Sequence, residues 1–354
     1  MIIKLADFFC GIGGIRLGFE RACQNLGVKC STVYSCDINK HARKVYKHRF
    51  GEEPDGDITK VNPKSLPDFD VALAGFPCQA FAHCGQKKGF EDARGTLFFN
   101  LAKIIAKKKP TAIFLENVKG LTFHDKGRTF RRILDILTND LGYNTFHNIL
   151  NSKNFGVPQN RPRIYIVAFK GVGGGFKFPE GTNSSRRLKD VLETSPVHPS
   201  HYLSSQYWET LKRHKARHAA IKGHQFGYVI RDEDDIAGAV MCSGMGRERN
   251  LVIDPRTTDF SGMKKLINTE HVRTMTMLEW ERLQGFDDGW TETFSTRRTL
   301  LGNSVTVPVI EAIATNMVRE ILNPNPNYRD NPNKTDDKDN YADQPWGQEA
   351  HDSR

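Results

Sequence analysis

Short apolar runs alternate with longer segments of helical periodicity over the first 170 residues. The apolar runs are rich in β-branched and aromatic residues and end at turn residues, which predicts strands. Apolar residues in the segments between them recur at helical spacing, which predicts helices. The predicted strands are 2–9, 29–35, 71–75, 112–116, 143–151 and 163–169, and the predicted helices are 15–26, 40–49, 96–107 and 129–141.

This alternation predicts an α/β fold, with a doubly wound, mainly parallel sheet covered by helices on both faces. The pattern breaks at the glycine-rich segment 171–175, which indicates a domain boundary, and helical patterning returns at 269–283 and 305–322. The end of the chain is polar and rich in Pro, Asn and Asp, which predicts disorder. We therefore predict a cofactor-binding domain over 1–170, a smaller mixed domain over 171–268, a return to the first domain over 269–322 and a disordered tail over 323–354.

Composition narrows the function classes. The net charge of +10 suits an anionic partner such as nucleic acid, although a solvated basic surface explains it equally well. The seven cysteines are scattered and form no CxxC pair, so we expect neither a disulfide framework nor a metal site. A reducing cytoplasm is the natural compartment for such a chain. The sequence contains no run of 18 apolar residues, so we expect no membrane span.

The first predicted strand leads into the glycine-rich turn Cys10-Gly11-Ile12-Gly13-Gly14. Such a turn lets a ligand approach the backbone at a helix N-terminus, although a tight turn alone would use the same residues. Asp37 follows the second strand, where an acid can accept both hydroxyls of a ribose. Asp57 could accept from an adenine amine. Either acid could instead be a helix cap or a turn residue.

A candidate nucleophile follows the strand 71–75, in Gly75-Phe76-Pro77-Cys78-Gln79. A cysteine held after a proline at a strand end is exposed and fixed, as a nucleophile must be. The alternative is a buried and inert cysteine.

Two further motifs provide candidate partners for this cysteine. Glu116 lies at the end of an apolar strand, where partial desolvation raises the pKa of a carboxyl group and lets it donate a proton. Asn117 can hydrogen-bond the backbone of the cysteine turn, although a helix cap would also explain this pair. Arg161 and Arg163 alternate along an extended segment and could bind a base oxygen and a phosphate, or form a surface basic cluster.

Together these motifs resemble the bacterial C5-cytosine DNA methyltransferases of type II restriction–modification systems. The order of motifs matches over residues 3–322 and continues with Arg273-Thr274-Met275-Thr276, Glu279, Arg282-Leu283-Gln284-Gly285-Phe286 and Gly302-Asn303-Ser304-Val305. One motif could arise by chance, but PCQ, ENV and QxRxR in this order leave little room for another family.

The resemblance implies a cofactor, a substrate and a set of roles. The cofactor is S-adenosylmethionine, and the substrate is a cytosine flipped out of double-stranded DNA. Cys78 adds to C6 of the base and Glu116 holds N3 and the exocyclic amine, while Arg163 contacts O2, Arg161 braces the site and Asn117 fixes the cysteine turn. The implied cofactor residues are Phe9, Gly11, Gly13, Gly14, Asp37, Ile38, Asp57, Ile58 and Asn303.

The resemblance also implies two DNA-binding regions. Residues 79–95, with Gln79, Lys87 and Lys88, form a loop that closes over DNA. Residues 171–268 form the target-recognition domain, in which the stretches 201–204 and 244–254 resemble members that modify CCGG. Arg247 and Arg249 are candidates for guanine readout, with ion pairing to Glu248 or Asp254 as the alternative. The basic segment 212–218 either meets phosphates or is a solvated helix face.

The sequence departs from the family pattern at two positions. Ala82 stands where a serine is typical, and Ile38 replaces an aromatic residue. Neither change removes a catalytic group, so we expect an active enzyme, a monomer that acts in the cytoplasm on nucleoid DNA. A cognate restriction endonuclease for the same site is a possible partner. The alternatives are an RNA cytosine-5 methyltransferase of the same fold and a catalytically inactive DNA-binding regulator.

Overall fold

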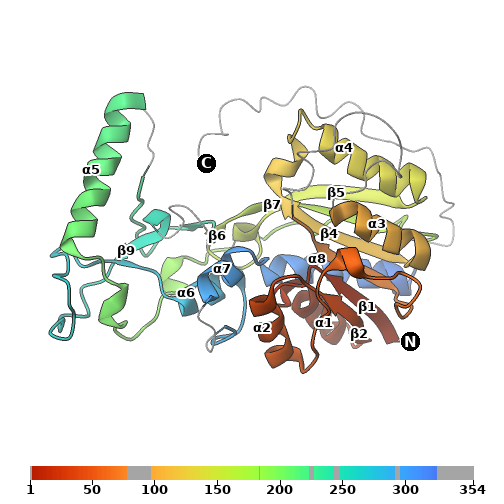
Figure 1. Cartoon of the computed structure of the whole chain (residues 1–354), viewed down its shortest axis with the longest axis horizontal. Helices are drawn as coiled ribbons and strands as arrows, with labels where there is room; N and C mark the ends of the chain where they lie inside the picture. The colour runs from red at the N-terminus through yellow and green to blue at the C-terminus, as the bar shows by residue number, and fades with distance from the viewer. Residues whose placement is uncertain are drawn as a thin grey trace.

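The computed structural model describes residues 2–77, 97–182, 184–222, 227–242, 248–291 and 296–324. A large body with the main sheet lies at one end of the long axis, and a smaller part with the helix α5 lies at the other (Figure 1). The strands are β1 Ile2–Phe8, β2 Lys29–Cys36, β3 Val71–Gly75, β4 Ala112–Val118, β5 Asn144–Asn151, β6 Gln159–Asn160, β7 Pro162–Phe169, β8 Ala237–Gly238, β9 Leu251–Ile253 and β10 Val272–Thr274. The α-helices are α1 Gly14–Asn25, α2 Lys40–Phe50, α3 Leu97–Lys108, α4 Arg128–Asp135, α5 Ser205–Lys222, α6 Met277–Gln284, α7 Arg297–Gly302 and α8 Val307–Leu322.

Among the described residues, six strands form the main sheet in the order β2-β1-β3-β4-β7-β5. β1, β2, β3 and β4 are parallel, whereas β7 runs antiparallel to both β4 and β5. The central strands are apolar on both faces, as expected for strands that helices cover on both sides. The predicted fold class, a mainly parallel α/β sheet, is therefore confirmed.

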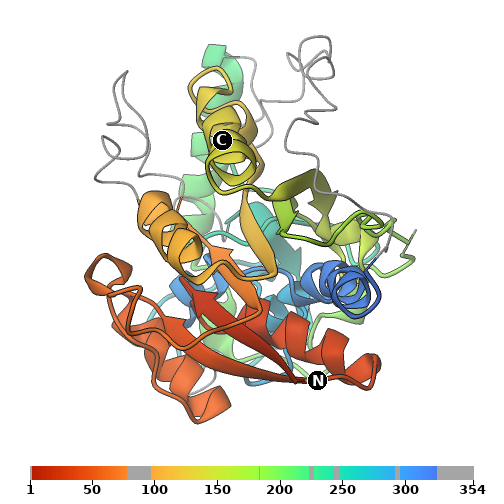
Figure 2. The same ribbon diagram turned by 90° about the vertical axis from the view of Figure 1, so that its right-hand side faces the viewer.

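Each face of the sheet has its own core. α1 and α8 cover one face, where Phe19, Ile310 and Ile313 are fully buried. α3 and α4 cover the other, where Leu101 and Ile133 are fully buried. The view along the long axis shows the helices on either side of the twisted sheet (Figure 2).

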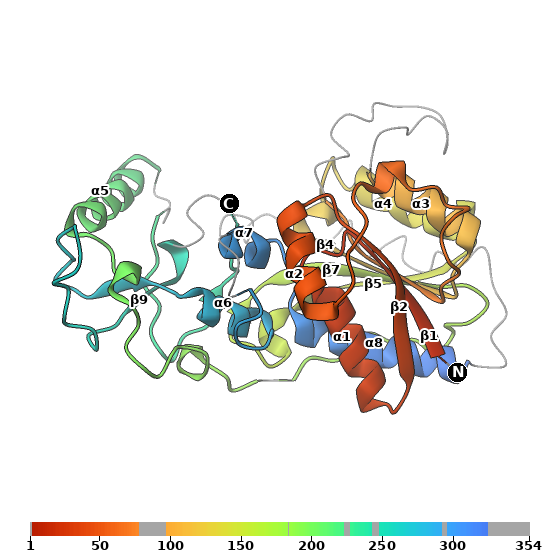
Figure 3. The ribbon, with the colours of Figure 1, turned by 60° about the horizontal axis from the view of Figure 1, so that its bottom comes forward.

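A third core joins the smaller part to the body. Leu188, Ala237 and Val240 pack in it against Trp280 of α6 and Leu301 of α7. Farther out, β9 and β10 pair antiparallel, and a small apolar cluster joins the first turns of α5 to these strands through Leu203, Trp208, Leu211, Leu251 and Val272. α5 extends away from the rest of the chain in a second view as well (Figure 3).

The structure corrects one element boundary. The helix expected over 269–283 is wrong at its start, because Val272–Thr274 is a strand and α6 begins only at Met277. At the glycine segment 171–175, the backbone N–H groups of Gly173 and Gly175 donate to Glu320 of α8, and Phe176 packs in the core beside that helix. The predicted loop 79–95 lies outside the described residues, as does the tail from residue 325.

No helix in the described parts of the chain is both long enough and apolar enough to cross a membrane.

Candidate active site

The carboxyl ends of the parallel strands bring the predicted motifs to one edge of the sheet. The glycine-rich turn follows β1, Asp37 follows β2, Pro77 follows β3, and Glu116 lies near the end of β4. Gly75 is the register partner of Glu116, and a Cβ built on Gly75 would lie 3.6 Å from the Glu116 carboxylate. The segment that leads to Cys78 therefore leaves the sheet directly beside Glu116.

The glycine-rich turn has backbone angles that favour glycine and leaves room for a ligand. Gly11 has φ +54°, and a Cβ placed there would meet no heavy atom within 4 Å. Gly13, with φ +85°, packs against Phe50, and a Cβ on Gly14 would lie 2.8 Å from Val305. The turn is thus fixed from behind by packing and is open at Gly11.

Asp37 connects this turn to the end of β2. Its carboxylate accepts the backbone N–H of Gly11 at 2.8 Å and that of Asn39 at 2.7 Å. Burial raises the pKa of Asp37, and these two hydrogen bonds oppose that rise. Each carboxylate oxygen keeps a second lone pair that could accept a ribose hydroxyl. The neighbouring Ile38 is 72% exposed, which leaves its side chain available to a flat ring.

Some of the other predicted cofactor residues are accessible to a ligand, whereas others are buried or already hydrogen-bonded. Phe9 has φ 54° and is half-buried, and Asn303 is exposed at the end of α7. Asp57 caps a 3-10 turn by accepting the backbone N–H of Thr59 at 2.9 Å, and Ile58 is buried. The cap was one of the roles considered for Asp57. The open glycine turn, with Asp37 after β2 and Asp57 in the connection between α2 and β3, therefore fits an adenosine-containing ligand.

Glu116 and Arg163 face each other on neighbouring antiparallel strands. Nε of Arg163 lies 3.3 Å from Oε1 of Glu116, and the two side chains are 16% and 12% exposed. Burial raises the pKa of Glu116, while the Arg163 and Arg161 guanidinium groups counteract part of that rise. The arrangement combines a buried carboxyl group, whose pKa is raised, with a guanidinium group beside it.

Asn117 holds the segment that precedes the cysteine. Its side-chain amide is buried and donates to the backbone carbonyl of Phe76 at 2.8 Å. Its Oδ1 accepts the backbone N–H of Val118. Cys78 itself lies outside the described residues, so the structure fixes the chain as far as Pro77.

Arg161 points into the protein, away from any substrate. The buried guanidinium donates to the backbone carbonyls of Val240 at 2.8 Å, Gly302 at 3.2 Å and Ser304 at 2.5 Å. Burial and the neighbouring Arg163 lower the pKa of Arg161. These bonds join the smaller part and the segment around Asn303 to the active-site edge. The bracing role fits them, whereas binding of a base or phosphate does not.

Two buried polar networks were not among the predicted site residues. Gln159 donates to Leu283 O at 2.8 Å and accepts the Val240 N–H at 3.0 Å, while the neighbouring Gln284 donates to Leu301 O. Gln159 belongs to the QxRxR motif, but nothing in its local pattern indicates that its partners lie more than 80 residues away.

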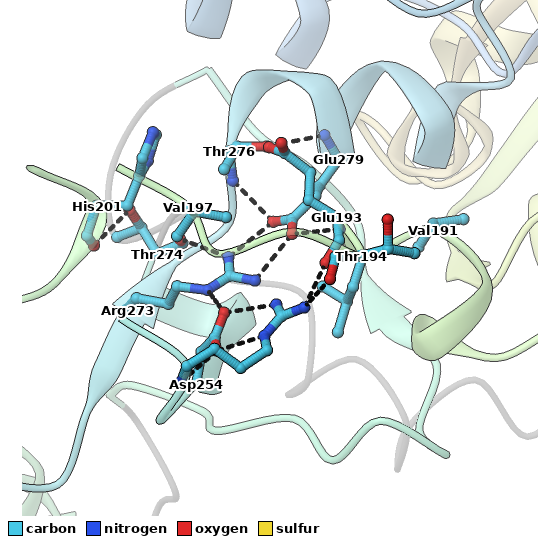
Figure 4. A network of polar contacts seen from close by, with 12 residues as sticks. Val191, Glu193, Thr194, Val197, His201, Asp254, Arg273, Thr274, Thr276 and Glu279 are labelled. Atoms are coloured by element: carbon cyan, nitrogen blue, oxygen red, sulfur yellow. Dashed lines mark hydrogen bonds and ion pairs between the residues drawn. The ribbon is translucent and has the colours of Figure 1, made fainter. Parts of the chain in front are cut away.

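The second network centres on Arg273, which is fully buried (Figure 4). Its guanidinium donates to Asp254 at 2.9 Å and makes two bonds of 2.9 Å to Glu279. Glu279 also caps the start of α6 by accepting the Thr276 N–H. This network ties the turn after β9 to α6.

Of the predicted DNA-binding residues, the structure describes one. Gln79, Lys87, Lys88 and Arg247 lie outside the described residues, as does Ala82. Arg249 is half-buried in the 3-10 turn Glu248–Asn250. Its neighbour Glu248 accepts the Tyr207 hydroxyl at 3.1 Å. Asp254 pairs with Arg256 and Arg273.

The fold and the site together define an α/β protein in which an open glycine turn and Asp37 lie at the same sheet edge as the buried Glu116 carboxyl group. The family model "C-5 cytosine-specific DNA methylase" matches residues 3–319. The chain therefore belongs to the C5-cytosine DNA methyltransferases, enzymes that use S-adenosylmethionine to methylate double-stranded DNA.

Characterised relatives match along most of their length. The chain is 49% identical to the type II methyltransferase M.HpaII of Haemophilus parainfluenzae, over 90% of this chain and 89% of that protein. It is 43% identical to M.NgoBI of Neisseria gonorrhoeae, over 87% and 91%.

Solved structures share the fold at lower identity. The Entamoeba histolytica methyltransferase EhMeth aligns with a TM-score of 0.70 at 21% identity, over 91% of this chain and 99% of that one. The Dnmt2 methyltransferase of S. pombe aligns with a TM-score of 0.66 at 20% identity, over 91% and 100%.

Proposed function

We propose that Cys78, Glu116, Asn117, Arg161 and Arg163 carry out the methylation of a flipped cytosine. The observation that supports this most directly is the Glu116–Arg163 pair beside the segment that ends at Pro77. A flipped base in this corner would meet a protonated carboxyl group and a guanidinium, which match N3 with the exocyclic amine and O2 respectively.

The chemistry of these residues proceeds in a defined order. The Cys78 thiolate bonds to C6 while Glu116 gives a proton to N3, which leaves a neutral enamine with a nucleophilic C5. Phe9, the glycine turn, Asp37, Ile38, Asp57, Ile58 and Asn303 would hold S-adenosylmethionine, which would supply the methyl group for C5 and be left as the thioether S-adenosylhomocysteine. A water molecule or hydroxide then takes the C5 proton, the C5–C6 double bond re-forms, and the Cys78 sulfur leaves as the thiolate while N3 returns its proton to Glu116.

A covalent trap tests this assignment. Duplex DNA with 5-fluorocytosine at the target has no proton to lose from C5, so the enzyme should stay bonded to it in a complex that survives denaturation. The Cys78→Ala variant should bind the same duplex without forming this complex. A stable complex with the variant would refute Cys78 as the nucleophile.

We further propose that residues 171–268 select the DNA site and that the site is CCGG. The 49% identity with M.HpaII extends over 90% of the chain, so it must include most of this region. Arg249, and Arg247 before it, are the proposed guanine-reading residues because guanidinium groups pair with guanine O6 and N7. Bisulfite sequencing of DNA from cells that express the chain tests this, and methylation at a different sequence would refute it.

We also propose that the enzyme acts as a monomer, as expected for a single domain pair that flips one base, and that a restriction endonuclease with the same specificity accompanies it. Light scattering of the DNA complex tests the first point. Cleavage of unmethylated but not methylated CCGG by an extract of the source cells tests the second.

A further inference from the structure

The helix α5 is anchored by buried side chains in its first turns, and beyond them its side chains are exposed or only half-buried. Trp208 and Leu211 are buried in the small cluster beneath it, and Trp208 Nε1 donates to Glu270 at 2.8 Å. From residue 212 to residue 220, no described side chain is buried. The helix stands out from the body in two views (Figures 1 and 3).

The projecting part of α5 is basic. Residues 211–222 contain no Asp or Glu, and their cationic residues are Lys212, Arg213, Lys215, Arg217 and Lys222. Two of these already have partners. Lys212 pairs with Glu209 at 2.5 Å and Glu270 at 3.0 Å, and the Lys215 ammonium lies 4.5 Å from the centre of the Tyr228 ring.

Arg213 and Arg217 differ from these lysines. They lie four residues apart, so they share one face of the helix, and both are exposed. Arg213 donates to the neighbouring Thr210 hydroxyl at 3.4 Å, which leaves most of its donors available to a partner. Cations in a last helical turn stabilise the helix through its dipole, but Arg213 lies about two turns before the end of α5. The dipole therefore does not explain this face.

We propose that the Arg213–Arg217 face of α5 binds the phosphate backbone of the substrate duplex outside the recognition sequence. The occupant is duplex DNA because the face is cationic, carries bidentate guanidinium donors and belongs to the part of the chain proposed to meet DNA. This inference rests on the proposed function of residues 171–268.

The base of α5 is connected to the proposed base-reading segment. The Tyr207 hydroxyl donates to Glu248, the neighbour of Arg249, at 3.1 Å. At a helical rise of 1.5 Å per residue, Arg217 lies about 15 Å along the axis from Tyr207. That length equals about four base-pair steps, so contact with phosphates beyond a four-base-pair site is within reach.

The test is the salt dependence of binding to two CCGG duplexes, a long one with flanks of about 12 base pairs on each side and a short, hairpin-closed one with a flank of about 1 base pair. For Arg213→Gln/Arg217→Gln, the negative slope of log K against log salt should become shallower by about two on the long duplex. On the short duplex the slope should stay unchanged. Arg213→Lys/Arg217→Lys keeps the charge and should keep the wild-type slope. Lys103→Gln/Lys107→Gln is the matched control, because these exposed lysines also lie four residues apart, on α3, which leads to the opposite edge of the sheet.

An unchanged slope in the Gln variant on the long duplex would overturn the inference. So would an equal loss on both duplexes, or the same loss in the α3 control. Transfer of methyl groups by the wild-type enzyme into the short duplex reports the proposed function separately. If that transfer occurs but the Gln variant shows no change of salt slope on the long duplex, the proposed role of α5 is refuted and the proposed function is not.

Discussion

Arg163 Nε lies 3.3 Å from the Glu116 carboxylate, and both side chains are largely buried where β4 ends and β7 begins. Two opposing effects act on the protonation of the Glu116 carboxyl group. Burial favours the neutral acid, and the guanidinium favours the carboxylate. A carboxyl group balanced in this way can both give a proton to a bound base and take it back, which the proposed chemistry requires.

The first prediction concerns the proton itself. Glu116→Gln preserves size and polarity but removes the acid, so the rate of methyl transfer should fall by about 10²- to 10⁴-fold. Single-turnover transfer of labelled methyl groups measures this. DNA affinity and the melting temperature should stay near wild-type values, and a variant with the wild-type rate would contradict the assigned role.

The second prediction concerns the pH dependence of the same group. Since Arg163 lowers the pKa of Glu116, Arg163→Gln should let it rise further. The acid form would then persist to higher pH, and the alkaline fall of the single-turnover rate should shift upward even though the rate itself drops. Arg163→Lys, which keeps a cation, should show a smaller shift. A downward shift in the Gln variant would be inconsistent with the pairing.

The third prediction separates ligand space from backbone strain. Gly11 and Gly27 both have positive φ, at +54° and +67°, and neither would place a Cβ within 4 Å of another atom. Alanine should therefore cost about 1–2 kcal/mol of stability at either position. Only Gly11→Ala should weaken S-adenosylmethionine binding, by about tenfold or more. Calorimetric titration of both variants measures this, and equal affinities would remove Gly11 from the cofactor site.

The fourth prediction concerns the buried network in Figure 4. Asp254→Asn leaves the Arg273 guanidinium with one carboxylate fewer, so it should lower the free energy of unfolding by about 3 kcal/mol. Asp288→Asn removes an exposed partner of Arg282 and should cost less than about 1 kcal/mol. Urea denaturation of both variants gives the comparison, and similar losses would argue against the network.

The same network sets a stability dependence at acidic pH. Burial alone would raise the pKa of Asp254, but hydrogen bonds from Arg256 and Arg273 outweigh it and hold the pKa at about 2. Because the folded pKa lies below the ordinary aspartate value of 3.8, this stabilisation is complete above about pH 4 and is lost as the pH falls toward 2. The acid-induced loss should be smaller in Asp254→Asn than in the wild type.

The fifth prediction concerns Asp7, a fully buried acid in β1. Burial raises its pKa to about 8, although Arg16 and a 3.4 Å bond from the Tyr46 hydroxyl oppose this. The folded state then binds more protons than the unfolded state between about pH 4 and 8, so this group lowers stability as the pH rises. Asp7→Asn should therefore gain at least about 1 kcal/mol relative to the wild type between pH 5 and pH 8. A difference that does not change with pH, in parallel melting curves, would contradict this.

The sequence determined the sheet, the order of its motifs and the family. Apolar runs such as 71–75 and 112–116 are buried on both faces, so their local composition identifies them as strands. Parallel strands end at a common edge, and that rule alone placed Asp37, Pro77 and Glu116 together. Local pattern misassigned Val272–Thr274, because a three-residue strand is defined by its pairing with β9 and has no periodicity of its own.

Tertiary structure alone decided where the long polar side chains point. Arg161 and Arg163 are two residues apart in one motif, yet one reaches three backbone carbonyls and the other reaches Glu116. The partners of Gln159 and Arg273 likewise come from distant segments. A buried polar group bonds to whichever complementary group the packing brings within about 3 Å. Spacing along the chain does not predict which groups those are.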